Sequence, residues 1–284
     1  MNGLHRRRAD SAGRDFALDI GPESAGWRYT GLRILELAPG AERTVPAGVN
    51  ETIVVPLSGA CTVQADGQRA DLAGRDNVFS GVTDVAYVPR DSALVVRSDG
   101  GGRFALATAR ASAPGAFRHV TAADVPVELR GAGPCSREVH NFGLPGVLAA
   151  DRIIACEVIT PGGNWSSYPP HKHDERRPGE SELEEIYYYE VDRDGPAYQR
   201  VYGTTERPID VLAEVRTGDV VLIPHGWHGP SMAAPGYDLY YLNVMAGPGP
   251  RAWAISDDPA HAWVRDTWVN QPVDARLPLA KVRA

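Results

Sequence analysis

The stretch YPPHKHDERRPGESELEEIYYYEV (residues 168–191) sets two histidines one residue apart, ahead of a charged segment and a run of three tyrosines. Residues i and i+2 of a β-strand point to the same face. His171 and His173 can therefore present two imidazoles to one site, with Lys172 facing away or lying at the rim. A transition-metal site of nitrogen and oxygen ligands needs such convergent imidazoles together with a carboxylate. The stretch predicts strands and a candidate metal site.

A third histidine is expected from a distant strand, and GDVVLIPHGWHGP (residues 218–230) offers His225 and His228. His225 falls in the turn that ends an apolar strand, where an exposed loop residue is the simpler interpretation. His228 falls where a returning strand begins. We therefore expect His228 to complete the histidine set and His225 to lie at the rim.

The acidic partner is open among four glutamates, because the loop DERRPGES breaks any fixed spacing from the histidine pair. The candidates are Glu180, Glu182, Glu184 and Glu185. Glu185 opens the strand EIYYYEV, so Tyr187 and Tyr189 share its face while Tyr188 packs on the other. We expect Glu185 to be the ligand, most of the acidic run to be solvated, and strand packing to be the first role of the tyrosines.

Composition favours an all-β protein. The 284 residues are 43% hydrophobic, and 30 glycines and 23 prolines favour turns and short strands over long helices. The net charge of −7 argues against a nucleic-acid surface or an acidic membrane surface, both of which need excess Lys and Arg. No stretch reaches the roughly 18 apolar residues of a membrane span. We expect short helices near residues 121–129 and 258–268, and a frayed terminus at the basic residues 5–8.

Three cysteines, Cys61, Cys135 and Cys156, are widely spaced and form no CxxC pair for zinc or redox chemistry. Each is expected to be a small core residue rather than a reactive thiol. The cytoplasm is the expected compartment.

The two halves of the chain repeat one pattern at a period of about 120 residues. ELAPG, ETIVVPLSG and VAYVPRDSA in the first half resemble VITPGG, EIYYYEV and VVLIPHGWH in the second. In this overlay Glu51 falls on Glu185. The histidine pair falls in PAGVN (residues 46–50), and His228 falls on Ala93. One half can therefore bind a metal and the other cannot.

The repeat predicts two tandem β-barrel or jelly-roll domains, residues 1–130 and residues 131–284. The first is expected to be metal-free, and the second to bind the metal and to carry a C-terminal extension. Next to the join, CSREVHN places Arg137 and His140 where a cleft could form. A guanidinium suits a carboxylate substrate because of its bidentate fork, and an inter-domain salt bridge or a loop cap is the alternative.

Four segments together carry a resemblance to a known family. They are NWSSYPPHKHD (residues 164–174), ESELEEIYYYEV (residues 180–191), GYDLYYLNVMAGP (residues 236–248) and DDPAHAWVRDTW (residues 257–268). The paired motifs resemble the cupin pattern, and within the cupins the chain resembles, over nearly its whole length, the 5-deoxy-glucuronate isomerase family of bacterial myo-inositol catabolism. That family is a bicupin with a degenerate first half, similar to the uronate ketol-isomerases of pectin breakdown. The resemblance implies a divalent metal on His171, His173, Glu185 and His228. His225 is a departure, since an arginine is expected there in much of the family.

The resemblance implies an aldose–ketose isomerisation of 5-deoxy-D-glucuronate to 2-deoxy-5-keto-D-gluconate without a redox cofactor. A metal that chelates the carbonyl and hydroxyl oxygens would stabilise the enediolate charge. Zinc or manganese suits this task best, and iron, cobalt or nickel also fits the ligand set. The candidate catalytic residues are Lys172, His140, Tyr189 and Tyr241. Arg137 is the expected contact of the substrate carboxylate, and Tyr187 is a second expected substrate contact.

Two rival interpretations stay open. The same four ligands suit ferrous iron in a cupin dioxygenase, and a structural metal suits a non-catalytic sugar-binding or regulatory bicupin. A regulator would be expected to add a DNA-binding module, and no helix-turn-helix segment is visible. The expected partner is a small sugar acid, with no nucleic acid and no membrane. Open sheet edges also favour a homo-oligomer.

Overall fold

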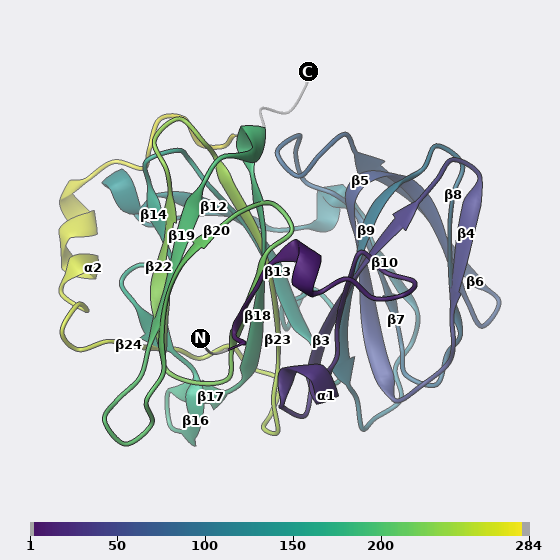
Figure 1. Cartoon of the computed structure of the whole chain (residues 1–284), viewed down its shortest axis with the longest axis horizontal. Helices are drawn as coiled ribbons and strands as arrows, with labels where there is room; N and C mark the ends of the chain where they lie inside the picture. The colour runs from purple at the N-terminus through teal and green to yellow at the C-terminus, as the bar shows by residue number, and fades with distance from the viewer. Residues whose placement is uncertain (1–2, 280–284) are drawn as a thin grey trace.

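The computed structural model describes residues 3–279 and is built mainly from β-strands. The strands form two sandwiches that lie side by side, one from each half of the chain (Figure 1). This arrangement confirms the expected all-β class. The helical pieces are α1 (Pro22–Ala25), α2 (Val264–Thr267), and the 3-10 turns η1 (Arg8–Asp10), η2 (Ala122–Asp124), η3 (Gly133–Cys135), η4 (Asp192–Asp194) and η5 (Trp268–Asn270). Within the described range no helix has the length and apolar character that crossing a bilayer requires.

The first sandwich is a nine-stranded antiparallel sheet folded over on itself. Its strands are β2 (Leu18–Ile20), β3 (Thr30–Leu37), β4 (Ala41–Val45), β5 (Asn50–Ala65), β6 (Gln68–Arg75), β7 (Val85–Val88), β8 (Leu94–Ser98), β9 (Gly102–Arg110) and β10 (Arg118–Val120). One path runs β10-β7-β5-β9-β3-β2, and β6 and β8 pair with β5 as well. β5 bends at Gly59, where φ is +81° and the register with β6 shifts. The bend lets one strand serve both layers.

The second sandwich packs a seven-stranded sheet against a six-stranded sheet. The seven-stranded order is β1 (His5–Arg6), β21 (Val220–Ile223), β18 (Glu184–Val191), β23 (Leu239–Ala246), β13 (Ile154–Thr160), β12 (Arg137–His140) and β11 (Val127–Arg130). The six-stranded order is β20 (Asp210–Val215), β19 (Ala197–Tyr202), β22 (Trp227–Ala233), β15 (His171–Lys172) and β24 (Ser256–Asp257), with β14 (Trp165–Ser166) beside β22. A separate hairpin joins β16 (Asp174–Arg177) to β17 (Glu180–Glu182).

The seven-stranded sheet is buried on both faces. On one face Tyr188 joins Ile53 and Tyr87 of the first sandwich in a shared core. On the other face Tyr187 and Tyr189 pack toward the six-stranded sheet. The side chains of β18 therefore alternate between two cores, as the strand period requires. This position explains why EIYYYEV contains three large side chains in succession.

Two further sequence expectations meet the structure here. The frayed N-terminus is wrong for His5 and Arg6, because they form the edge strand β1, which pairs with Val221 and Val220 of β21. The three cysteines are buried and unpaired, as expected of core residues. The strands of residues 18–120 belong to the first sandwich and those of residues 127–257 to the second. The domain division at residue 130 stays a prediction.

Candidate metal centre and active site

Three histidines converge inside the second sandwich. His171 on β15 lies directly opposite His228 on β22, and His173 follows at the end of β15. One ligand atom of each histidine lies within 4.8 Å of the other two, and all three side chains are buried. Lys172 points away, and its Nζ lies 2.6 Å from Oδ1 of Asp174. The structure therefore brings together the three histidines that the sequence singled out, and their role as ligands stays a prediction.

The carboxylate of Glu185 faces these histidines from the start of β18, between β21 and β23. Its Oε2 lies 3.0 Å from Nε2 of His173 and 3.1 Å from Nε2 of His228. Its Oε1 accepts a hydrogen bond of 2.6 Å from the Asn243 amide. Burial alone would raise the pKa of this carboxyl, but the charge of His228 and the hydrogen bond from His173 outweigh burial and lower the pKa to about 2. Glu185 is thus an ionised oxygen donor.

The other three candidate glutamates have different environments. Glu180 accepts a hydrogen bond of 2.7 Å from Lys172. Glu184 accepts hydrogen bonds from the three backbone N–H groups of residues 28–30 in the first sandwich. Glu182 is exposed on β17. Of the four glutamates, Glu185 is the one that faces the histidines.

The donor set fits a divalent metal ion. Nδ1 of His173 and Nε2 of His228 are buried and make no hydrogen bond within the described part of the chain. A buried nitrogen of this kind costs free energy unless a ligand occupies it. Burial, with the nearby His228 and His173, also holds the pKa of His171 well below its ordinary value, so this imidazole is neutral. Neutral imidazoles and a carboxylate are ligands that zinc, manganese, iron, cobalt and nickel accept.

A cavity of about 400 Å³ opens beside the histidines. Its polar lining includes Arg137, Ser167, His171, Tyr187, Tyr241 and Asn243. The cavity therefore places two of the candidate tyrosines and the candidate carboxylate-binding arginine next to the histidine cluster. A small sugar acid has room there, since ligand cavities of a few hundred Å³ are typical.

Arg137 is a buried cation without a carboxylate partner in the described part of the chain. Its Nη1 donates to the Cys135 carbonyl at 3.1 Å, and its Cζ lies 5.7 Å from the centre of the Trp268 ring. Burial lowers the pKa of Arg137 to about 10, which leaves the guanidinium protonated at neutral pH. A buried, unpaired guanidinium that lines a cavity is suited to an anionic ligand.

Three candidate catalytic residues lie outside this cavity. The Lys172 ammonium is held by three carboxylates, and its hydrogen bonds to them raise its pKa against the effect of burial. Tyr189 donates a hydrogen bond of 2.9 Å to the Gln199 side chain, deeper in the sandwich. His140 lies on the opposite face of the seven-stranded sheet. Tyr241 alone among the four candidates lines the cavity.

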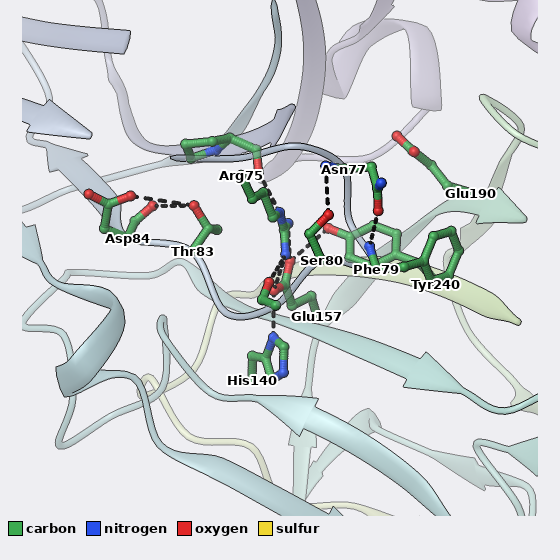
Figure 2. A network of polar contacts seen from close by, with 12 residues as sticks. Arg75, Asn77, Phe79, Ser80, Thr83, Asp84, His140, Glu157, Glu190 and Tyr240 are labelled. Atoms are coloured by element: carbon green, nitrogen blue, oxygen red, sulfur yellow. Dashed lines mark hydrogen bonds and ion pairs between the residues drawn. The ribbon is translucent and has the colours of Figure 1, made fainter. Parts of the chain in front are cut away.

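His140 belongs to a buried network that joins the two sandwiches (Figure 2). Its Nδ1 lies 2.6 Å from Oε1 of Glu157, and its Nε2 lies 2.7 Å from Oε1 of Glu138. Glu157 also accepts hydrogen bonds from Arg75 of the first sandwich and from the Tyr240 hydroxyl. Burial opposes protonation of His140, but the two carboxylates outweigh it and raise the pKa to about 9. The network therefore holds a charged imidazole between two carboxylates, away from the cavity.

Sequence reasoning missed Ser167 and Asn243. Asn243 lies opposite Tyr187 in the ladder between β18 and β23, and it holds the Glu185 carboxylate. Its signal was a lone amide inside the apolar run of β23. Ser167 donates or accepts hydrogen bonds with two tyrosine hydroxyls, and its backbone has a φ of +48°. No sequence pattern marks such a serine.

The C-terminal extension forms one wall of the cavity. β24 pairs Asp257 with His171, and Arg265 donates a hydrogen bond of 2.7 Å to Asp257. The ring of Trp268 lies 5.7 Å from Cζ of Arg137 and 5.1 Å from Cζ of Arg265. A tryptophan from the extension thus lies close to both guanidinium groups.

Glu51, the first-half counterpart of Glu185, has a structural role. Its buried carboxylate accepts a hydrogen bond of 2.6 Å from Tyr87 and three more from the backbone N–H groups of residues 151–153. Across the described part of the chain, the single cluster of three or more possible metal ligands is the histidine cluster of the second sandwich. The first sandwich keeps the acidic position but uses it to fasten the second half of the chain.

Comparison with known proteins gives a match along nearly the whole chain. A model of the KduI/IolB family matches residues 4–264. A protein of Geobacillus thermodenitrificans (strain NG80-2) named 5-deoxy-glucuronate isomerase is 41% identical over 252 residues, which are 87% of this chain and 90% of that protein. An IolB-like protein from Salmonella typhimurium LT2, solved as a crystal structure, is 34% identical with a TM-score of 0.86 and covers 92% of this chain and 98% of its own.

A more distant likeness concerns the fold alone. The oxalate decarboxylase of Lactobacillus farciminis is 14% identical, with a TM-score of 0.66, over 90% of this chain and 89% of that chain. The oxalate decarboxylases have the cupin fold, so the match across both sandwiches confirms the expected all-β cupin fold.

Proposed function

The chain belongs to the KduI/IolB family, and from that membership we propose that it isomerises 5-deoxy-D-glucuronate to 2-deoxy-5-keto-D-gluconate in inositol catabolism. Relatives that are 41% and 42% identical over most of the chain carry the name 5-deoxy-glucuronate isomerase. The observation that carries the proposal is one cavity lined both by His171 of the buried histidine cluster and by the unpaired buried Arg137. A metal ion there could polarise the sugar carbonyl and the arginine could bind the carboxylate, which are two tasks in the isomerisation of a sugar acid. The names of the relatives favour neither the dioxygenase nor the non-catalytic bicupin.

The proposed metal ligands are His171, His173, His228 and Glu185. When bound there, a divalent ion supplies Lewis-acid polarisation of a carbonyl oxygen and the neighbouring hydroxyl oxygen. Asn243 orients the ligand set, because its amide hydrogen bond fixes one oxygen of Glu185 and leaves the other facing the histidines. Zinc or manganese is the proposed ion, since the reaction has no redox step.

Arg137 is the proposed contact of the substrate carboxylate. A fixed guanidinium binds a carboxylate in two parallel hydrogen bonds, which sets the orientation of the sugar chain as well as its affinity. Trp268 restrains Arg137 from one side, and the Cys135 carbonyl restrains it at Nη1. Tyr187 is the proposed second substrate contact, because it lines the same cavity as Arg137 and its ring centre lies 6.1 Å from that of His228.

The finer organisation of the protein is also proposed. Residues 1–130 would be a supporting, metal-free domain and residues 131–284 the catalytic domain, which agrees with the role of Glu51 described above. Homo-oligomer formation is supported by large apolar side chains that are exposed on the second sandwich and its extension, among them Leu212, Trp263 and Val269. Three buried, unpaired cysteines agree with a cytoplasmic location.

The test combines metal analysis with an anaerobic assay. Purified wild type and His171→Ala are analysed for bound metal, and ketone formation from 5-deoxy-D-glucuronate is followed by NMR without oxygen. The proposal expects one divalent ion per chain and oxygen-independent turnover in wild type, and loss of both in His171→Ala. His119→Ala is the control, because His119 lies on the first sandwich near Asp84. If metal-loaded wild type forms no ketone in the absence of oxygen, the isomerase proposal is wrong.

A further inference from the structure

Three hydroxyl groups form a connected cluster on the wall of the cavity. The Ser167 Oγ lies 2.9 Å from the Tyr187 hydroxyl and 3.3 Å from the Tyr241 hydroxyl. The two tyrosines come from β18 and β23, and their ring centres are 5.0 Å apart. All three residues line the cavity together with His171. Ser167 therefore bridges two tyrosines of the central sheet at the place where the substrate is expected.

Ser167 has a backbone conformation that serine disfavours. Its φ of +48° is left-handed, a conformation that a serine adopts at a free-energy cost. The strand β22 encloses it, because a Cβ on Gly229 would lie only 1.7 Å from the Ser167 carbonyl oxygen. A non-glycine residue kept in such a conformation beside a candidate active site points to a functional requirement for its side chain.

We propose that Ser167, Tyr187 and Tyr241 form a relay that carries the oxygen-bound proton of the substrate during isomerisation. The proposal rests on the proposed function. In the aldose the proton is on the oxygen of the C2 hydroxyl, and in the ketose a proton is on the oxygen at C1. The relay accepts the proton from the first oxygen at one tyrosine and gives a proton to the second oxygen from the other tyrosine. Each of the three hydroxyls gains one proton and loses one, so none changes its charge. The hydrogen on C2 moves to C1 in a separate transfer, in which the C2–H bond breaks and a C1–H bond forms. Together the two transfers convert the C1 carbonyl to an alcohol and the C2 alcohol to a carbonyl.

The surroundings favour neutral hydroxyls for this task. The carboxylate that lines the cavity, Asp257, is held by Arg265 in two hydrogen bonds. Lys172 and His140 lie outside the cavity and are held by carboxylates. A hydroxyl both donates and accepts, so a chain of three can reverse its donor direction without an ionised member. The relay is therefore the proton path that the cavity offers without breaking an ion pair.

The relay predicts a specific pattern in metal-loaded variants. Ser167→Ala removes the hydroxyl and keeps the backbone strain, while Ser167→Gly removes the hydroxyl and relieves the strain. Both are expected to lower kcat by about 10²-fold or more, the usual range for a lost proton-transfer group, with KM and metal content close to wild type. Ser167→Gly is expected to be at least as stable as wild type. Tyr187→Phe and Tyr241→Phe should also lower kcat, and Tyr187→Phe should in addition raise KM, because Tyr187 is the proposed second substrate contact.

The control is Tyr188→Phe, which removes a hydroxyl from the same strand but on the opposite face, where it bonds Glu190. It is expected to lose stability and to keep kcat. A second readout is the solvent deuterium isotope effect on kcat. Wild type and Tyr188→Phe should both have a larger kcat in H2O than in D2O, by the same ratio, and this ratio should differ in both Ser167 variants. Wild-type kcat in Ser167→Gly, with an unchanged isotope effect, would overturn the relay alone. Absence of turnover in metal-loaded wild type would instead overturn the proposed function, and the relay with it.

Discussion

Arg75 and Glu157 form a bidentate ion pair across the boundary between the two sandwiches (Figure 2). The Nη1–Oε1 and Nη2–Oε2 distances are 2.8 and 2.7 Å, and the two side chains are 3% and 1% exposed. Arg75 also donates to two backbone carbonyls of its own sandwich. The pair therefore fixes the position of one sandwich against the other at a site that water does not reach.

Arg75→Met is expected to destabilise the protein strongly, because the Glu157 carboxylate stays buried after it has lost its guanidinium partner. Removing one member of a buried pair typically costs about 3–5 kcal/mol. Arg69→Met on the same strand is the matched control, since Arg69 and Asp71 are 58% and 67% exposed. Water and salt screen an exposed pair of this kind, so its loss should change stability very little. The measurement is urea unfolding of the three proteins, and equal losses in the two variants would contradict the role given to Arg75.

His140 is expected to make stability depend on pH. Its pKa rises from 6.5 to about 9 in the folded protein, so the folded state binds the proton more tightly. Its contribution is therefore complete below pH 6.5 and is lost as pH rises through about 9. Glu157 stays ionised across this window, because Arg75 and His140 outweigh burial and lower its pKa to about 2. The free energy of unfolding should fall by up to about 3 kcal/mol over this window.

Urea titrations at several pH values check this, with His140→Gln as the comparison. The variant is expected to be less stable than wild type at low pH and to lose little more on the alkaline side. A wild-type profile as flat as that of His140→Gln would show that the imidazole is not protonated by folding.

The part of the site that could be predicted from the sequence was predicted from local patterns. The period of two along a strand placed His171 and His173 on one face and Tyr188 on the other, and the repeat favoured His228 over His225. Both arguments use only strand geometry and chain order. They apply here because the side chains of β18 alternate between two buried faces, and because β15 lies beside β22 with His171 opposite His228.

Long-range partners could not be predicted in the same way. Lys172 and His140 are attractive bases in sequence, but Glu180 and Glu157 neutralise them, and nothing local indicates those pairings. Ser167 owes its place to a left-handed backbone, and Trp268 reaches Arg137 only because the C-terminal extension folds back over the cavity. These features depend on the tertiary packing of distant segments.

Glu185→Gln is expected to weaken metal binding by more than about 100-fold, since losing a residue that merely supports a ligand already costs about 10- to 100-fold. Glu184→Gln is the matched control, because Glu184 precedes it in the chain but caps backbone N–H groups of residues 28–30. The control should keep the metal affinity and lose about 1–2 kcal/mol of stability. Competition with a coloured chelator, using Zn²⁺ and Mn²⁺ separately, gives the affinities. Wild-type affinity in Glu185→Gln would return Glu180 and Glu182 to consideration.

Arg137→Lys and Arg137→Met are expected to separate the shape of the guanidinium from its charge. A hydrogen bond to a charged group contributes about 1.5–3 kcal/mol, so Arg137→Met should lower kcat/KM by about 10- to 100-fold, mainly through KM. Lysine keeps the charge but loses the fork, so the loss of kcat/KM in Arg137→Lys should be intermediate.

The decisive comparison uses a substrate analogue whose carboxylate is replaced by a hydroxymethyl group. Wild type should lose as much kcat/KM with the analogue as Arg137→Met loses with the substrate, and the variant should barely distinguish the two compounds. If Arg137→Met still prefers the carboxylate as strongly as wild type does, the anion is bound elsewhere, and Arg130 and Arg265 are the remaining guanidinium groups of the cavity.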